Sequence, residues 1–179
     1  VEPQRNKIQL YCNQVFVTDE VKDVVPEFLM LLHGVIDSPD IPLNVSRSYL
    51  QGDARVKQVN QYITRKVADK LDEMFRNERE TYESKWDSIN VFVKYGMISE
   101  EKFAEKARKF CLLTDLNNKN YTIDEYIEKV SPLQTDKDKK VVLIYTNDAV
   151  KQHAYISNVE RKGYSVLKLD GVLDNHFIS

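Results

Sequence analysis

The fold class follows from residues 141–169, which read VVLIYTNDAVKQHAYISNVERKGYSVLKL. The run at 141–145 is continuously apolar, as is typical of a strand that is buried on both faces. A helix is predicted over about 148–162, and Gly163 is placed to stop it. Residues 166–169 supply a second strand, which a right-handed crossover connection would place parallel to the first. This stretch therefore predicts a small α/β unit.

Helical patterns dominate the residues before this unit. Apolar residues at steps of three and four predict a long amphipathic helix with Asp53 as its cap: Val56, Val59, Ile63, Val67, Leu71 and Met74. A second helix is predicted through Tyr82, Trp86, Ile89 and Val93, and a shorter one over about 99–112. The middle of the chain should therefore be mainly helical.

Two further helix signals flank the α/β unit. Thr122 and Glu125 have the capping-box spacing, so a short helix should begin there and stop before Pro132. The charged residues 135–140 predict a solvated connector. After the second strand, the apolar residues Val172, Leu173, Phe177 and Ile178 indicate the first turns of another helix.

The N-terminal residues predict one strand and one helix. Residues 8–17 have β-branched and aromatic content, and a bulge near Asn13 and Gln14 would absorb a slip in their alternation. A heavily apolar helix is predicted over 24–36, followed by a loop at 37–42. No partner for the strand is evident nearby, so we expect its partners to lie upstream of Val1, and its edge could pair with another copy.

Composition excludes several classes of protein. The 179 residues contain 26 Lys and Arg against 28 Asp and Glu, so the charge excess that nucleic-acid binding requires is absent. No apolar stretch approaches the roughly 20 residues of a membrane span. Cys12 and Cys111 have neither metal-type nor disulfide-type spacing, which favours a reducing cytoplasm. The start at Val1 predicts a boundary inside a longer protein.

A search for catalytic chemistry excludes the common sites. The five glycines are too dispersed to form a phosphate-binding loop of the Walker or dinucleotide type. His33, His153 and His176 occur in unrelated contexts, so no zinc site is predicted. Cys111 precedes two leucines and is interpreted as a small buried hydrophobic residue.

One segment, residues 34–51, has a different character. Arg47 and Gln51 lie one helical turn apart if a helix starts near Ser46, so both would project on the same side. An arginine in a first helical turn is usually solvated or paired with an acid. Its rigid fork nevertheless suits phosphate recognition and the neutralisation of charge during phosphoryl transfer.

The same segment resembles the middle domain of the heat-shock protein 90 family in its bacterial form. The resemblance rests on Leu43-Asn-Val-Ser-Arg-Ser-Tyr-Leu-Gln51, which is similar to a Leu-Asn-x-Ser-Arg-x-x-Leu-Gln core of the family. Further similar stretches follow in family order and span nearly the whole chain: 8–18, 26–37, 92–96, 144–146 and 163–169. Ser48 stands where the family commonly has Glu, which affects a local ion pair that could orient Arg47.

The resemblance implies a homodimeric chaperone in three parts. An N-terminal ATPase domain holds ATP with Mg²⁺, a middle domain completes the catalytic site, and a C-terminal domain dimerises. It further implies that Arg47 reaches the ATP γ-phosphate in the closed full-length protein, that Gln51 supports the same loop, and that client proteins bind. The isolated chain is then expected neither to bind ATP tightly nor to hydrolyse it.

The predicted architecture is α/β in three parts. Residues 1–76 form part of an α/β/α three-layer sandwich, residues 77–138 a helical connector, and residues 139–179 a small α/β/α unit. Two alternatives remain. The chain could be a passive protein-interaction scaffold in which Arg47 is structural. It could also be a self-contained nucleotide-using enzyme built on 139–179, which would need a phosphate loop at 146–148, where no glycine stands.

Overall fold

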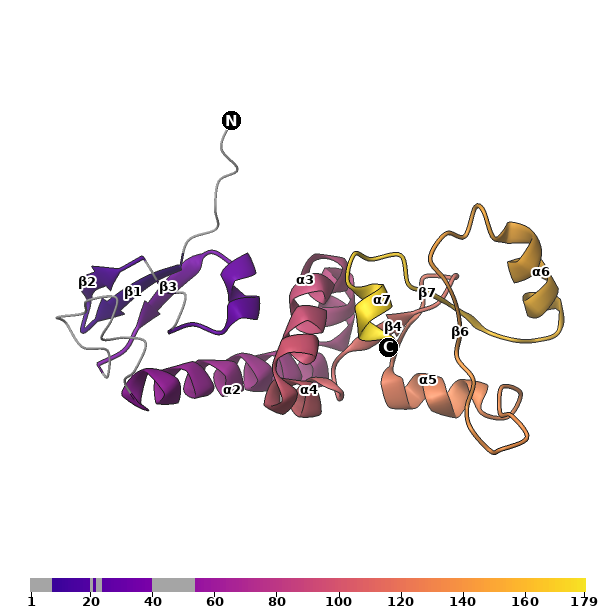
Figure 1. Cartoon of the computed structure of the whole chain (residues 1–179), viewed down its shortest axis with the longest axis horizontal. Coiled ribbons are helices and arrows are strands. Elements are labelled where there is room, and N and C mark those ends of the chain that lie inside the picture. The colour runs from indigo at the N-terminus through magenta and orange to yellow at the C-terminus, as the bar shows by residue number, and fades with distance from the viewer. Residues whose placement is uncertain (1–7, 20, 22–23, 40–53) are drawn as a thin grey trace. The chain divides into compact units, whose positions relative to one another are not determined.

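The computed structural model describes residues 8–19, 21, 24–39 and 54–179, in two compact units, Val1–Lys70 and Leu71–Ser179. The predicted α/β class is confirmed, because helices alternate with small sheets in both units (Figure 1). The position of Asp53, the predicted cap of the long helix, lies outside the described residues.

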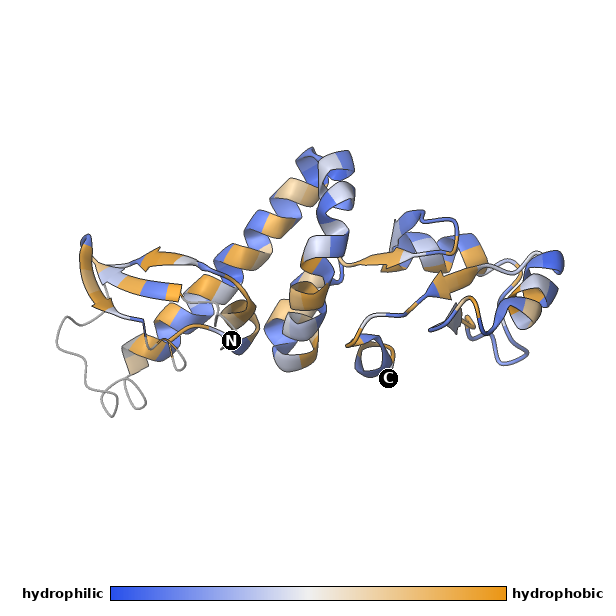
Figure 2. Cartoon of the chain, turned by 90° about the horizontal axis from the view of Figure 1, so that it is seen from above, coloured by the Kyte–Doolittle hydropathy of each residue, from blue (hydrophilic) through white to orange (hydrophobic). Residues whose placement is uncertain are grey.

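The first unit contains a three-stranded sheet in the order β2-β1-β3. Strand β1 (Ile8–Cys12) pairs antiparallel with β2 (Val15–Thr18) and parallel with β3 (Gly34–Asp37). Ile8, Leu10 and Cys12 point to the buried face, as their alternation predicts. Hydrophobic residues colour much of all three strands in Figure 2.

Three predictions about this part of the chain are wrong: the bulge near Asn13, the lack of strand partners and the helix over 24–36. Asn13 and Gln14 do not form the predicted bulge: both have positive φ, 50° and 67°, and they make the two-residue turn of a β1–β2 hairpin. The register of this pair is irregular instead between Leu10 and Tyr11. The strand does not lack partners, because β1 is the central strand, with β2 and β3 from the same chain on its two sides. The proposed pairing of this strand with another copy therefore loses its basis.

The third correction concerns the helix predicted over 24–36. A short 3₁₀ helix, η1 (Glu27–Leu31), forms after Pro26, and residues from Gly34 onward join the sheet as β3. Phe28 and Leu29 supply the buried side of η1. Pro26 and Gly34 interrupt the apolar run, and pairing with β1 satisfies the backbone of Gly34–Asp37 instead.

The long amphipathic helix is confirmed as α2 (Ala54–Asn77). Its residues within the first unit bury Val56, Val59 and Ala68, and Thr64 donates a hydrogen bond back to the carbonyl of Asn60 at 3.0 Å. This i−4 bond satisfies the one buried hydroxyl on the helix face among the described residues.

The second unit begins with the end of α2, followed by two further helices. Helix α3 (Arg79–Ser99) is longer than the apolar pattern predicts, and α4 (Glu101–Ala107) is shorter. The Tyr82 ring lies 5.6 Å from that of Phe75, and its hydroxyl donates to the carbonyl of Phe110 at 2.8 Å. The helix predicted to reach residue 112 ends early because Leu112 enters a strand.

Small sheets and short helices complete this unit. Strands β4 (Leu112–Thr114) and β5 (Asn120–Thr122) pair antiparallel and lead into α5 (Ile123–Val130), whose predicted capping box is present. Strands β6 (Ile144–Thr146) and β7 (Val166–Lys168) pair parallel around α6 (His153–Arg161), which confirms the predicted β-α-β order. The first strand differs from the prediction: it does not begin until Ile144, and it is not buried on both faces, because Val142 and Tyr145 are 44% and 45% exposed. Helix α7 (Asp174–Phe177) follows, as its apolar residues predict. A core of Leu113, Tyr126, Val130, Leu167 and Leu169 joins these elements.

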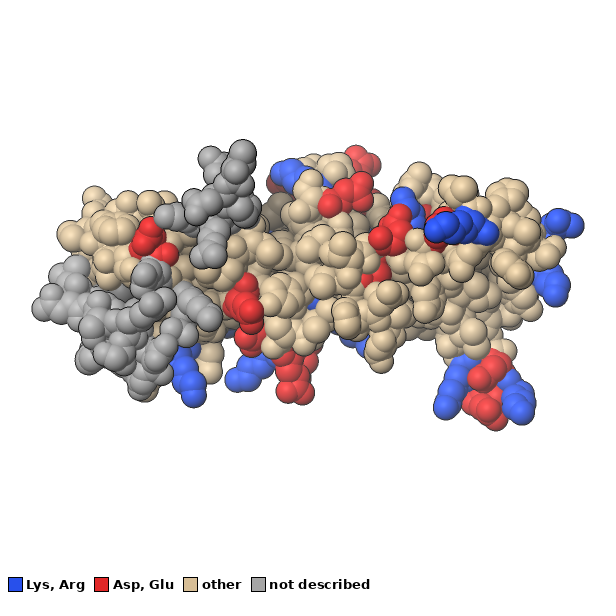
Figure 3. Space-filling view, turned by 45° about the horizontal axis from the view of Figure 1, so that its top comes forward, with Lys and Arg blue, Asp and Glu red and all other residues tan. Residues whose placement is uncertain are grey.

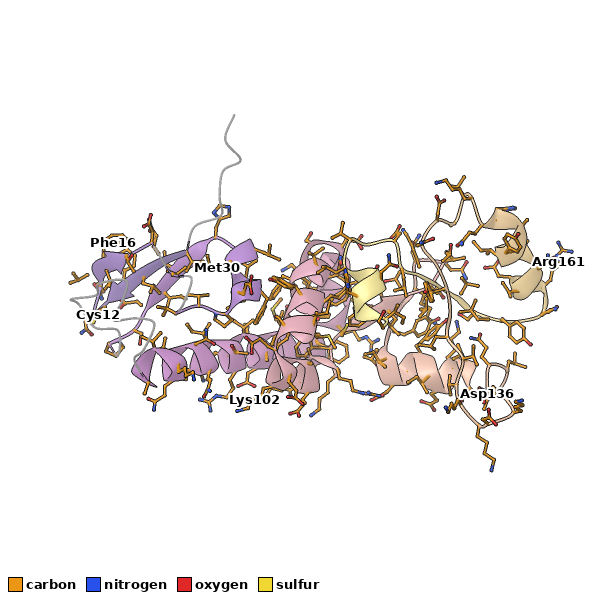
Figure 4. The ribbon with its side chains drawn as sticks, viewed as in Figure 1. Cys12, Phe16, Met30, Lys102, Asp136 and Arg161 are labelled. Carbon is orange, nitrogen blue, oxygen red and sulfur yellow. The ribbon has the colours of Figure 1, made fainter. Side chains whose placement is uncertain are left out.

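The charged connector at 135–140 is a tight, self-bonded turn. The Asp136 carboxylate accepts hydrogen bonds from the backbone N–H groups of Asp138 and Lys140, at 2.8 and 2.9 Å. Asp136 lies at this turn in Figure 4, away from the core of the unit. The side chain thus satisfies the backbone of the turn while its charged neighbours stay solvated.

Candidate functional site

Arg47 and Gln51, the predicted site residues, and Ser48 beside them lie outside the described residues. The structure does describe the elements on either side of their segment: β3 and residues 38–39 before it, and α2 after it. These two elements therefore define the setting of the candidate site.

Hydrogen bonds link the end of β3 to the β1–β2 hairpin. The Asp37 carboxylate accepts a hydrogen bond from the backbone N–H of Gln14 at 2.9 Å, and the backbone N–H of Ser38 donates to the carbonyl of Tyr11 at 3.0 Å. The Cys12 thiol points to the carbonyl of Pro39, with the sulfur 3.7 Å from the oxygen. These three contacts hold residues 37–39, which precede the family-like motif at 43–51 in the sequence.

A groove of about 680 Å³ lies between this end of β3 and α2. Its walls combine apolar and hydrogen-bonding groups: Ile36, Asp37, Ser38, Pro39, Gln58, Val59, Tyr62 and Ile63. Arg65 and Lys66 lie over the Tyr62 ring, 5.5 and 5.4 Å from its centroid, and add positive charge at α2. Among the described residues, this first unit contains no paired acid, base or nucleophile that could perform chemistry by itself.

The second unit contains a buried ion pair that the sequence did not reveal. Lys94 of α3 and Asp174 of α7 have side chains 9% and 4% exposed, and Nζ lies 2.5 Å from Oδ1. The other carboxylate oxygen accepts from the backbone N–H of Gly171 at 2.8 Å. Lys94 also lies over the Phe177 ring, 5.5 Å from its centroid. The lysine stands within the family-like stretch 92–96, but no local pattern indicates a partner 80 residues away.

Cys111 is confirmed as a buried structural residue. Burial raises the pKa of its thiol to about 12, with the Lys94 ammonium acting in the opposite direction. Because the thiolate is the nucleophilic form, Cys111 is unreactive at neutral pH.

An exposed clamp joins the start of α3 to the start of α5. The Arg79 guanidinium donates two parallel hydrogen bonds to the Glu125 carboxylate, at 2.9 and 2.6 Å. The same carboxylate accepts from the backbone N–H of Thr122 at 2.8 Å as part of the capping box. The hydrogen bond from Arg79 lowers the pKa of Glu125 from 4.5 to about 2, although desolvation acts in the opposite direction.

The carboxyl end of β6 is where a nucleotide-using α/β enzyme would bind phosphate. Here the Asp148 carboxylate accepts from the backbone N–H of Lys151 at 3.0 Å, and the Thr146 hydroxyl accepts from the N–H of Asp148 at 3.2 Å. Side chains of this chain thus occupy the donors that a phosphate would need, and Asp148 adds a repelling negative charge. This arrangement argues against the alternative in which residues 139–179 form a self-contained nucleotide-using enzyme.

Neither a metal-binding cluster nor a membrane-spanning helix is found among the described residues. Acidic and basic side chains are interspersed on the face shown in Figure 3. Among the described residues, no three His, Cys, Asp or Glu side chains are grouped to hold a metal ion. Within that same part of the chain, every helix is too short or too polar to cross a membrane.

Comparison with known proteins identifies the family. The family model described as Hsp90 protein matches residues 1–179. The middle domain of a Plasmodium falciparum heat shock protein has a similar fold, with a TM-score of 0.64 at 19% identity, covering 99% of this chain and 68% of that one. The fold is thus that of an Hsp90 middle domain.

The similarity to bacterial relatives is much higher. The chaperone protein HtpG of Porphyromonas gingivalis is 60% identical over 98% of this chain, and that of Bacteroides thetaiotaomicron is 54% identical over 100%. The chain therefore belongs to the Hsp90 family, and its fold is that of the middle domain. It spans 26% of the length of each of these two relatives.

Proposed function

We propose that this chain is the middle segment of an ATP-driven folding machine. In the closed full-length protein, Arg47 contacts the γ-phosphate of the ATP that the N-terminal domain of the same polypeptide holds with Mg²⁺, and Gln51 supports Arg47. The observation that carries the proposal is the segment from Leu43 to Gln51, found within a chain that the Hsp90 family model matches from end to end.

The chemical role follows from the side chain. The guanidinium is always charged and presents a planar fork of donors, so it can neutralise charge that develops on a transferring phosphoryl group. Because Arg47 belongs to a different domain from the nucleotide, it helps only when the domains close, and this couples hydrolysis to a conformational step. The dispersed glycines offer no phosphate cradle, so the chain alone neither binds ATP tightly nor hydrolyses it.

The remaining partners follow from the same proposal. The full-length protein dimerises through its C-terminal domain and binds unfolded or partly folded clients, in part through this middle segment. Support comes from the word chaperone in the names of the bacterial relatives. Two free, buried cysteines suit a protein that works in a reducing cytoplasm.

The decisive test is steady-state ATP turnover by the full-length protein carrying Arg47→Ala, with nucleotide affinity measured on the same variant. We expect turnover to fall at least about tenfold, or roughly 1.4 kcal/mol of activation free energy, while affinity holds. Arg47→Lys keeps the charge but loses the fork, so most of the loss should remain. Arg76→Ala, which removes an exposed arginine near the end of α2, is the matched control and should leave turnover unchanged.

The opposite result would favour the passive scaffold. If Arg47→Ala retains full turnover, Arg47 has only a structural role and the segment contributes no catalysis. Equal losses in Arg47→Ala and Arg76→Ala would also contradict the proposal, because they would indicate a general effect of removing positive charge.

A further inference from the structure

The second unit contains a polar pocket of about 430 Å³ that the proposed ATPase role does not use. It lies where the β4–β5 loop, α5, the end of α6 and the start of β7 meet. Its lining residues are Asp115, Leu116, Asn117, Lys129, Glu160, Gly163, Tyr164, Ser165 and Val166. The pocket thus brings one cation and two carboxylates together with the hydroxyls of Tyr164 and Ser165.

The two carboxylate oxygens of Asp115 have different hydrogen-bond partners. The side chain is only 5% exposed, and Oδ1 accepts short hydrogen bonds from the backbone N–H groups of Asn117 and Lys119, each at 2.9 Å. Oδ2 has only long contacts, 3.5 Å to the Tyr121 hydroxyl and 3.7 Å to Lys129 Nζ. Oδ1 therefore stabilises the β4–β5 loop, whereas Oδ2 can still accept a shorter hydrogen bond from a ligand.

Lys129 is placed to donate beside that acceptor. It lies 3.7 Å from Asp115 Oδ2 and 3.5 Å from Ser165 Oγ, both long for a hydrogen bond. Burial lowers its pKa, but Tyr121 and Asp115 outweigh this effect and raise the pKa above the ordinary value, so the ammonium stays charged. The ammonium also lies over the Tyr121 and Tyr126 rings, 4.8 and 6.0 Å from their centroids. A donor and an acceptor thus lie side by side, each with long hydrogen-bond distances to its neighbours.

This pairing favours ligand groups that both accept and donate hydrogen bonds. A ligand that engages both residues accepts from Lys129 and donates to Asp115, as a carboxamide or a hydroxyl can. A backbone peptide group does not fit, because in the trans form its C=O and N–H point in opposite directions. The side-chain carboxamide of Asn or Gln has its oxygen and one N–H on the same edge, so it can bond both groups.

An exposed apolar side chain beside the pocket indicates which kind of molecule would present the carboxamide. Leu133 is 62% exposed, and its Cδ1 lies 3.5 Å from the position that a Cβ on Gly163 would take. The exposed side chain therefore adjoins the pocket wall. An apolar residue next to an Asn or Gln would bury surface on Leu133, which favours a polypeptide segment over a small polar solute.

We propose that this pocket binds the Asn or Gln carboxamide of a non-native polypeptide segment, with an apolar neighbour of that residue packed on Leu133. The inference rests on the client binding of the proposed function and names a surface for it. Glu160, at the pocket wall, adds a preference against acidic neighbours in the segment.

The test titrates the ¹⁵N-labelled 179-residue chain with N-acetyl-Leu-Gln-Leu-N-methylamide and follows the backbone signals of Asn117 and Gly163. We expect saturable shifts, and at least about tenfold weaker binding of the peptide with Met in place of Gln, which lacks the carboxamide. This exchange alters only the peptide, so a misfolded variant cannot imitate the result. Equal affinities for the two peptides, or no saturable shifts, would overturn the proposal.

Protein variants test the named groups. Asp115→Asn keeps an oxygen for the loop but replaces the free acceptor with a donor, and Lys129→Met removes the ammonium, so each should weaken Gln-peptide binding at least about tenfold. Leu133→Ser should weaken it as well, whereas Lys151→Met, at an exposed lysine of the same unit, should not. Equal affinity in Lys129→Met and Lys151→Met would refute the assigned roles.

A titration with trehalose distinguishes a peptide site from a site for small solutes. Trehalose that saturates the same signals as tightly as the Gln peptide would make this pocket a site for small polyhydroxyl solutes and overturn the peptide assignment. ATP turnover of full-length Arg47→Ala is independent of these titrations. Failure of peptide binding with a loss of turnover would therefore reject this surface alone, while unchanged turnover would reject the ATPase role.

Discussion

At the scale of single residues, the strongest constraint in the second unit is the buried pair of Lys94 and Asp174. Replacing Lys94 by Met leaves a carboxylate with a side chain only 4% exposed and no cation beside it. We expect Lys94→Met to lower the free energy of unfolding by about 3–5 kcal/mol, measured by urea denaturation.

The matched control is the double variant Lys94→Met with Asp174→Asn. It removes both charges, and the new amide oxygen still accepts from Gly171, so a large part of the lost stability should return. A double variant as unstable as the sum of the two single changes would show that the charges are not energetically coupled.

Glu125 gives the molecule a predictable response to acid. Its pKa falls from 4.5 in the unfolded chain to about 2 in the folded one, so its pairing stabilises the fold above about pH 4.5 and is lost as the pH falls toward 2. The carboxylate is 42% exposed, so solvent screening reduces this contribution.

The measurement is the urea midpoint of the wild type and Glu125→Gln, which keeps an oxygen for the Thr122 cap, between about pH 6 and pH 3. The wild type should be more stable near pH 6, and the difference should shrink as the pH falls. A difference that does not change with pH would mean that the Arg79–Glu125 clamp contributes no charge-dependent stability.

At the scale of elements, the β1–β2 hairpin carries backbone strain at Gln14. Its φ of 67° lies in the left-handed region, where a side chain is unfavourable and glycine is not. The backbone N–H that binds Asp37 is retained in Gln14→Gly, so we expect a gain of about 0.5 kcal/mol, reduced by the greater freedom of glycine in the unfolded chain.

Gln9→Gly is the natural comparison, because Gln9 is extended in the middle of the same sheet. This change should destabilise the protein by about 0.5–1 kcal/mol. Thermal unfolding of both variants provides the measurement. Destabilisation of similar size in Gln14→Gly would show that the Gln14 side chain contributes more than its strained backbone costs.

Elements encoded by local patterns could be predicted, and those made by distant pairing could not. The periodicity of α2 and the Thr122–Glu125 capping box each lie within one stretch of sequence, and both are confirmed. The hairpin at Asn13 was missed because its turn lacks the usual glycine, and β3 was missed because its strand character comes from pairing with β1, more than 20 residues away.

The functional residues likewise fall into those that the sequence could predict and those that it could not. Arg47 and Gln51 were found through resemblance to a family motif, and their role stays a prediction. The pair of Lys94 with Asp174 and the pocket at Asp115 escaped prediction, because each joins side chains from separate elements and depends on how those elements pack. The position of a lysine within the apolar stretch 92–96 was the one sequence signal that could have indicated the Lys94–Asp174 pair, because a lysine buried there needs a partner.

At the scale of the whole molecule, the chain is about a quarter of the length of each of the two bacterial HtpG proteins. Its proposed tasks are distributed accordingly: a phosphate contact from Arg47 in the first unit, and a polypeptide contact at Asp115 and Lys129 in the second. Neither task requires a complete active site within this chain, so variants in one unit should leave the other task measurable.

The Lys94–Asp174 pair also constrains how sequences of this kind can diverge. Either residue changed alone leaves a desolvated charge, so an intermediate with one substitution is less fit than either end state. Two positions 80 residues apart must therefore change nearly together or remain as they are. A salt bridge that adds little to net stability can in this way make part of the sequence slow to evolve.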